Sequence, residues 1–152
     1  MGPRKERMKI WICSFCGHLA LDQRPVRCPV CQGDGETFQP NDQIFSEVDD
    51  SPVMRAQHKP VVTVQVHCPH IHETDCVEVT AKVGEALHPM EEGHAIVWVD
   101  FYVDNGHVSR VVLSPECHAV AGAYLNTRGT HVTAVARCNL HGYWMGQNVI
   151  PE

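Results

Sequence analysis

The sequence has 152 residues and a formal net charge of −6, a length that suits one ordinary domain or a small domain followed by a medium one. An acidic chain of this kind lacks the basic face that binds nucleic acid, and no apolar run reaches membrane-spanning length. Eight cysteines and eleven histidines make metal binding the leading class of function.

The cysteines are expected to bind metal rather than to form disulfides. The N-terminal segment 1–9 is polar, and the apolar segment 10–15 is too short for the core of a signal peptide. We therefore expect a reducing compartment, the cytoplasm, where paired cysteines usually hold metal. Cys68, Cys76 and Cys117 are interpreted as buried free thiols that behave as small apolar residues.

The first feature along the chain is a pair of C-x-x-C motifs, Cys13 with Cys16 and Cys28 with Cys31, within residues 11–39. Two such turns place four thiolates around one ion, and that ion closes a segment too short to fold by apolar burial alone. Four thiolates suit either zinc or iron. A structural zinc ribbon and an iron centre that carries electrons therefore both remain open.

The surroundings of these motifs resemble a rubredoxin-type module of the short kind attached to larger non-haem iron proteins. The resemblance is carried by Trp11 before the first motif, Gly17 after it, the sequence C-P-V-C of the second, and Phe38 at the end. It implies a one-electron iron centre on the four cysteines, with zinc as the alternative metal.

Residues 40–59 lose apolar periodicity and collect acids and prolines, which predicts a linker with one short turn or helix around residues 43–48. The predicted domains are residues 1–45, a small metal domain with its linker, and residues 46–152.

From Pro60 onward the pattern predicts β-strands. Apolar and polar residues alternate over 62–66 and 77–83, whereas 95–103 is apolar on nearly both faces, as a central strand would be. The tripeptide Asp104-Asn105-Gly106 predicts a hairpin turn with Asn and Gly at the left-handed positions. Short strands with turns between them predict a mainly β fold, an antiparallel sandwich. The further strands are expected over 107–113, 117–125 and 131–137.

Five candidate metal ligands fall at strand ends or in loops of this sandwich, where distant parts of the sequence can converge on one ion. Imidazoles suit iron, copper, nickel or zinc, and a thiolate adds electron density to the metal. Five protein ligands leave one open position on an octahedral ion, which fits a small oxygen species better than a bulky substrate. The five candidates are His67, His88, His94, Cys138 and His141.

The choice of His67 over its neighbours His70 and His72 rests on one feature. Only His67 among these three stands before x-Pro in a loop. His58 and the other histidines outside the five candidates are interpreted as surface or turn residues.

Three motifs resemble those of the superoxide reductase family, the desulfoferrodoxins and neelaredoxins, over residues 60–147. They are H-C-P at His67, H-P-M-E-E-G-H from His88 to His94, and C-N-L-H-G-Y-W from Cys138 to Trp144. The resemblance implies an immunoglobulin-like sandwich in which four histidines hold ferrous iron equatorially and Cys138 is axial. Superoxide would be reduced by one electron to hydrogen peroxide at this centre, and the rubredoxin-like iron site would re-reduce it.

The same resemblance implies the partners. These are superoxide and an external electron donor, such as a rubredoxin or its reductase, together with further copies of the chain in a homo-oligomer. Neither nucleic acid nor membrane is expected among them.

One departure from the family concerns the two residues before the first ligand histidine, which are commonly glutamate and then lysine. With His67 as that histidine, these positions are Gln65 and Val66. The lysine is implied to attract the anion and to help deliver a proton, and the part of the chain after residue 40 has six bases against fourteen acids. We expect a slower enzyme that takes its proton from water or from Lys59, Lys82, His70 or His72. The alternative is an electron-transfer or iron-sensing protein with little turnover.

Overall fold

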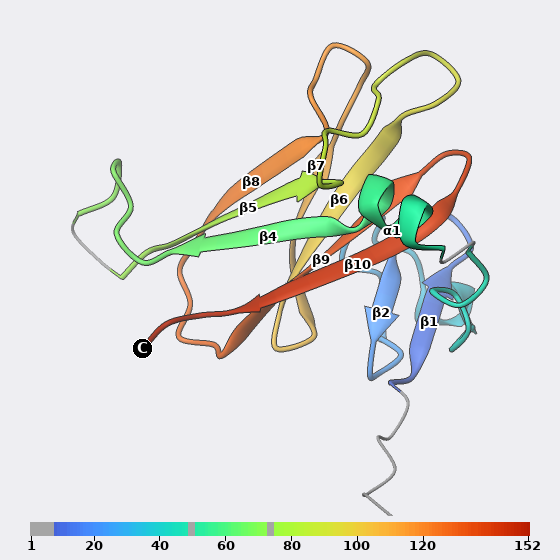
Figure 1. The fold of residues 1–152 in the computed structure, drawn as a ribbon. Helices are drawn as coiled ribbons and strands as arrows, with labels where there is room; N and C mark the ends of the chain where they lie inside the picture. Colours follow the sequence, from blue (N-terminus) through green and yellow to red (C-terminus); the bar gives the residue numbers. More distant parts are fainter. Residues whose placement is uncertain (1–7, 49–50, 73–74) are drawn as a thin grey trace, which may run out of the picture. The chain divides into compact units, whose positions relative to one another are not determined.

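The computed structural model describes residues 8–48, 51–72 and 75–152, and the chain forms two compact units, Met1–Ile44 and Phe45–Glu152 (Figure 1). Antiparallel strands dominate both units, which confirms the predicted mainly β fold class. Among the described residues, no helix combines the length and the apolarity that crossing a bilayer requires.

The first unit is a three-stranded antiparallel sheet with the order β2-β1-β3. Its strands are β1 (Ile10–Cys13), β2 (Leu19–Leu21) and β3 (Phe38–Pro40), and the 3-10 turn η1 (Gly35–Thr37) leads into β3. One of its buried clusters consists of Ala20, Phe38 and two of the metal-motif cysteines. So small a core fits the expectation that an ion stabilises this unit.

The second unit is a sandwich of two antiparallel sheets, with the orders β10-β9-β6-β7 and β4-β5-β8 (Figure 1). Inward-facing residues of both sheets form one core, because alternate residues of a strand point to the same face. The bounds are β4 (Pro60–Gln65), β5 (Val77–Val83), β6 (Ile96–Val103), β7 (Gly106–Val112), β8 (Val120–Leu125), β9 (His131–Cys138) and β10 (Gly142–Val149).

The last strand, β10, was not expected from the sequence, which placed the end of the sandwich at residue 137. It pairs with β9 along its whole length, from Gly142 opposite Cys138 to Val149 opposite His131. Its two glycines and its polar end hide the period-2 pattern. A Cβ at Gly146 would collide with the backbone carbonyl of Pro60, so glycine allows β10 to approach the start of β4.

A helix, α1 (Pro52–His58), lies within the segment predicted to be a linker, so the linker prediction was wrong there. Its N-terminus is capped by Ser51, whose hydroxyl accepts a hydrogen bond of 3.3 Å from the amide of Met54, and Pro52 is its first residue. The helix is short and has no apolar period of its own. The capping sequence was therefore the only local signal for it.

The hairpin between β6 and β7 forms where predicted, but its left-handed positions lie one residue earlier. They are Asp104 (φ 47°) and Asn105 (φ 70°), and Gly106 already begins β7. Hydrogen bonds from the Thr130 hydroxyl and amide to the Asp104 carboxylate hold this turn and lower the pKa of that carboxyl group. These bonds favour aspartate at a position that most side chains avoid.

The loop between β4 and β5 contains a disulfide bond between Cys68 and Cys76. The expectation that both are free thiols was wrong, although both are buried as expected. Cys117 is a free thiol, but it is exposed rather than buried. The separation of eight residues between Cys68 and Cys76 does not by itself predict a disulfide, because the pairing depends on the register of the two strands that flank the loop.

Removing this disulfide should destabilise the second unit. For a loop of this size, the loss of the cross-link should lower the free energy of unfolding by about 2–3 kcal/mol, because the unfolded chain gains conformational freedom. Urea denaturation of the Cys68→Ser/Cys76→Ser variant measures this loss. Cys117→Ser is the control and should unfold at the wild-type urea concentration; equal midpoints for all three proteins would contradict the prediction.

Candidate metal centres

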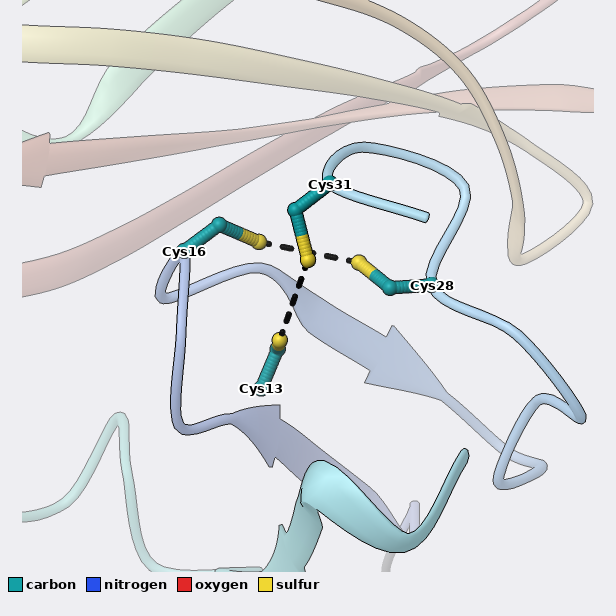
Figure 2. A group of neighbouring side chains, drawn as sticks. All are labelled: Cys13, Cys16, Cys28 and Cys31. Carbon is teal, nitrogen blue, oxygen red and sulfur yellow. Dashed lines mark hydrogen bonds between the residues drawn. The ribbon is translucent and has the colours of Figure 1, made fainter. Parts of the chain in front are cut away.

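The four cysteines of the first unit converge on one point, as the C-x-x-C spacing predicts. Figure 2 shows their sulfur atoms pointing toward one another from two turns. The Sγ atoms of Cys13 and Cys31 are 3.7 Å apart, those of Cys16 and Cys28 are 3.6 Å apart, and all four lie within 4.8 Å of one another. Tetrahedral ligands on bonds of about 2.3 Å are separated by about 3.8 Å, so this group fits a single ion.

Backbone hydrogen bonds close both cysteine turns. The amide of Gly17 donates to the carbonyl of Cys13 at 2.9 Å, and the amide of Gln32 donates to the carbonyl of Cys28 at 3.0 Å. Gly17 and Gln32 both have positive φ angles, which lets the chain reverse directly after each motif. The turns therefore fix the direction of the sulfur atoms before any ion is added.

The thiols differ in their tendency to ionise. Burial opposes the charge on Cys13, but the Thr37 hydroxyl and nearby backbone amides outweigh it and lower the pKa of this thiol to about 6. Burial raises the pKa of Cys16 and of Cys28. A cation would offset the cost of ionising these two thiols, because metal ligation requires the thiolate.

A second cluster lies in the sandwich, where four segments of the second unit meet. His58 is the last residue of α1, His94 lies in the loop before β6, Cys138 ends β9, and His141 lies in the turn before β10. Their ligand atoms all lie within 4.8 Å of one another. His88 joins them, since its Nε2 is 3.6 Å from the Cys138 sulfur.

The structure corrects the sequence prediction at one position, because His58 and not His67 completes this cluster. His58 precedes β4 and His67 follows it, and a six-residue strand is about 20 Å long. His67 instead lines a cavity of about 970 Å³ beside the disulfide. The missed signal is a second H-x-P sequence, His58-Lys59-Pro60, hidden in the segment taken as a linker.

This correction also moves the positions before the first histidine. They are Ala56 and Gln57 rather than Gln65 and Val66, and Gln57 is exposed on the last turn of α1. Neither residue carries the charge that the family resemblance implies at these positions.

Hydrogen bonds to backbone carbonyls fix the tautomers of two histidines. Nδ1 of His58 lies 2.8 Å from the carbonyl of Met54, and Nδ1 of His88 lies 2.7 Å from the carbonyl of Pro89. Because a carbonyl only accepts, each Nδ1 carries the proton and donates it. Each Nε2 is then left with a lone pair, as in a metal-ligating histidine whose outer N–H is held.

The ring nitrogens of the cluster lie close to one another. Nε2 of His58 is 3.2 Å from Nδ1 of His141, and Nε2 of His94 is buried with no hydrogen-bond partner among the described residues. Two ligands at right angles on bonds of about 2.1 Å would be about 3 Å apart, close to the observed distance. The donor set of four imidazoles and one sulfur therefore fits a single transition-metal ion.

Burial keeps two imidazoles of the cluster, His58 and His88, in the protonation state that a metal needs. His58, His88 and Cys138 are at most 4% exposed. Burial lowers the pKa of His88 to about 4, and it also lowers the pKa of His58. Both imidazoles are therefore neutral near pH 7 and able to donate to an ion.

Comparison with known proteins decides the family. A family model described as Desulfoferrodoxin matches residues 51–147, a span that includes α1, all but the end of β10 in the two sheets, and every member of the second cluster. The chain belongs to the desulfoferrodoxin family.

Relatives of this family match the chain beyond that span. The chain is 31% identical over 140 residues to a desulfoferrodoxin homolog of Archaeoglobus fulgidus, covering 91% of this chain and 96% of the relative. It is 28% identical over 142 residues to the desulfoferrodoxin of Syntrophotalea carbinolica, covering 93% and 98%. The superoxide reductase of Treponema pallidum shares the fold, with a TM-score of 0.59 and 24% identity over 91% of this chain and 98% of that one.

Substitution of the two competing histidines tests the composition of this desulfoferrodoxin cluster. His58→Ala removes one of the atoms that would bind the metal, so metal affinity at the second cluster should fall by more than about 100-fold. This is more than the usual effect of removing a residue that only hydrogen-bonds to a ligand. The matched control is His67→Ala, which should bind metal like the wild type. Titration of the metal-free proteins with ferrous iron measures both, and weaker binding by the His67 variant alone would contradict the assignment.

Acid should destabilise the metal-free protein in a defined interval. Because the pKa values of His58 and His88 are lowered from the usual 6.5, the unfolded chain takes up these protons before the folded chain does. The contribution of these two neutral histidines to the free energy of unfolding should therefore be complete above pH 6.5, and it should be lost as the pH drops toward 4. Urea denaturation across this interval measures the fall, and His88→Gln should show a shallower one.

Proposed function

We propose that this protein is a superoxide reductase. The reaction adds one electron and two protons to superoxide and gives hydrogen peroxide. The observation that carries the proposal is the second cluster, in which four imidazoles surround a point beside the buried sulfur of Cys138. The shared fold with the Treponema pallidum superoxide reductase and the desulfoferrodoxin relatives support it.

The proposed ligands of the catalytic iron are His58, His88, His94, His141 and Cys138. Ferrous iron held there would supply the electron. The chain contributes orientation, because the carbonyls of Met54 and Pro89 fix two of the rings, and burial, which keeps these rings neutral. As a thiolate ligand, Cys138 would add electron density to the metal and favour electron donation.

We propose a second iron ion at Cys13, Cys16, Cys28 and Cys31, where it would return an electron to the catalytic centre after each turnover. The resemblance to rubredoxin supports iron at this site, while the tetrahedral spacing of the sulfur atoms also suits zinc. An external donor, such as a rubredoxin or its reductase, would supply the electrons. We also propose that the protein works as a homo-oligomer in the cytoplasm, where the five cysteines proposed as metal ligands would stay reduced, although the Cys68–Cys76 disulfide is unusual for that compartment.

The replacement of His67 by His58 in the cluster changes which side chains can supply the protons. Of the four side chains considered from the sequence, Lys82 donates to the carbonyl of Glu85 at 2.6 Å, and His70 and His72 lie in the loop that carries the disulfide. Lys59 directly follows His58 and is exposed. We infer that water or Lys59 delivers the protons to the product.

The neutral residues Ala56 and Gln57 favour a second candidate function, an electron-transfer or iron-sensing protein with little turnover. An acidic chain repels an anion at long range, and neither residue offsets this near the cluster. This candidate has the same metal sites and differs only in its reaction with superoxide.

Pulse-generated superoxide separates the two functions. For the enzyme, we expect rapid oxidation of the ferrous centre, which a change in visible absorbance measures. One hydrogen peroxide should form per iron oxidised, and no molecular oxygen should be released. His94→Ala, which lacks a proposed ligand, is the control and should not react in this way. Slow oxidation of a fully iron-loaded wild-type protein would favour the second function.

A lysine placed at the corrected position should speed the reaction. Gln57→Lys adds a positive charge next to His58, and attraction of the anion should raise the second-order rate of iron oxidation by up to about tenfold at low salt. Val66→Lys adds the same charge at the other end of β4 and is the matched control. Equal acceleration by both variants would show that net charge alone is responsible.

A further inference from the structure

Trp144 contacts two members of the second cluster in two different ways. It lies on β10 and is 4% exposed. Its ring is stacked on the ring of His58, with centroids 4.8 Å apart and planes 19° apart. Its indole N–H donates a hydrogen bond of 3.0 Å to the carbonyl of His141.

These two contacts join segments that are far apart in the sequence. His58 comes from the end of α1, whereas His141 comes from the turn between β9 and β10. The Nε2 of His58 and the Nδ1 of His141 are nevertheless only 3.2 Å apart. A single rigid side chain that touches both residues can fix this separation and the angle between the two rings.

The outer side of Trp144 supports the same role. Together with Arg55 and Lys59, the indole lines a cavity of about 260 Å³, and none of the described residues that line this cavity is a cluster histidine. His58 is 1% exposed, and the stacked indole covers one face of its ring.

We propose that Trp144 is a positioning residue for the catalytic metal centre, which it serves by stacking on His58 and by holding the carbonyl of His141. This inference rests on the proposed function for the identity of the centre. The inference goes beyond the proposed ligands, because Trp144 is not itself a ligand but contacts two neighbouring ones, His58 and His141. Loss of either contact should loosen the metal, as loss of the outer partners of ligands commonly does.

Two variants separate the two contacts. Trp144→Phe keeps an aromatic ring against His58 but loses the N–H donor, and Trp144→Leu loses both. The matched control is Trp98→Phe, which makes the same chemical change on β6, at an indole that stacks under Arg110 and whose N–H has no hydrogen-bond partner among the described residues. Each protein is loaded with ferrous iron at both sites.

The experiment measures three quantities. They are the rate at which a chelator removes iron from each site, the visible absorption of the oxidised second cluster, and the melting temperature of the metal-free protein. We expect iron to leave the second cluster about tenfold faster in Trp144→Phe and up to about 100-fold faster in Trp144→Leu. The absorption band should shift in both variants, while iron at the four cysteines leaves at the wild-type rate.

The control decides between positioning and general stability. A release rate in Trp98→Phe equal to the wild-type rate, together with fast release in the Trp144 variants, supports the inference even if melting temperatures fall in all three. Wild-type release and an unchanged band in both Trp144 variants would overturn it. If wild-type protein binds iron but does not reduce superoxide, the proposed function fails while the inference on Trp144 stands.

Discussion

A sulfur atom with no exposure to water, Cys138, lies among imidazole lone pairs, and this arrangement determines much of the second unit. A thiolate buried in such a place needs a cation, and the neighbouring imidazole nitrogens can bind the same ion. The segments that provide these atoms are a helix end, a long loop, a strand end and a tight turn. The sandwich holds them together because its strands bring all four segments to one place.

The turn between β9 and β10 shows how local structure prepares this arrangement. Gly142, with a φ angle of 82°, lets the chain reverse directly after His141, so Cys138 and His141 share one turn. Asn139 ties the turn to the segment of His94: its amide donates to the carbonyl of Ala95, and its side chain accepts from the amide of Ala95. Two ligand-bearing segments are thereby held together by two hydrogen bonds, one between backbone groups and one to the Asn139 side chain.

The sequence predicted the features that depend on local spacing. The four thiols of the first unit, the mainly β sandwich, and the convergence of His88, His94, Cys138 and His141 all follow from short motifs and period-2 alternation. The errors lie where tertiary contacts decide. The strand β10 has a weak alternation and is held by pairing with β9, and the disulfide depends on the register of β4 with β5.

The exchange of His58 for His67 has a similar origin. Both histidines stand in an H-x-P sequence, one at each end of β4, so the motif alone cannot choose between them. The choice depends on which end of the strand faces the other ligands. That end is set by α1, a single short helix whose capping residues Ser51 and Pro52 gave the only sign of its presence.

The close approach of β10 to β4 makes the geometry of the metal centre depend on backbone packing at residues that are not ligands. Gly146 lies against the carbonyl of Pro60, and Pro60 is two residues from His58. Even one methyl group at residue 146 would push on the start of β4 and so on an imidazole that it never touches. Gly146 thus sets the distance between β10 and the start of β4, and through it the position of the His58 ring. Evolution can therefore alter the metal centre through a residue that lies outside it.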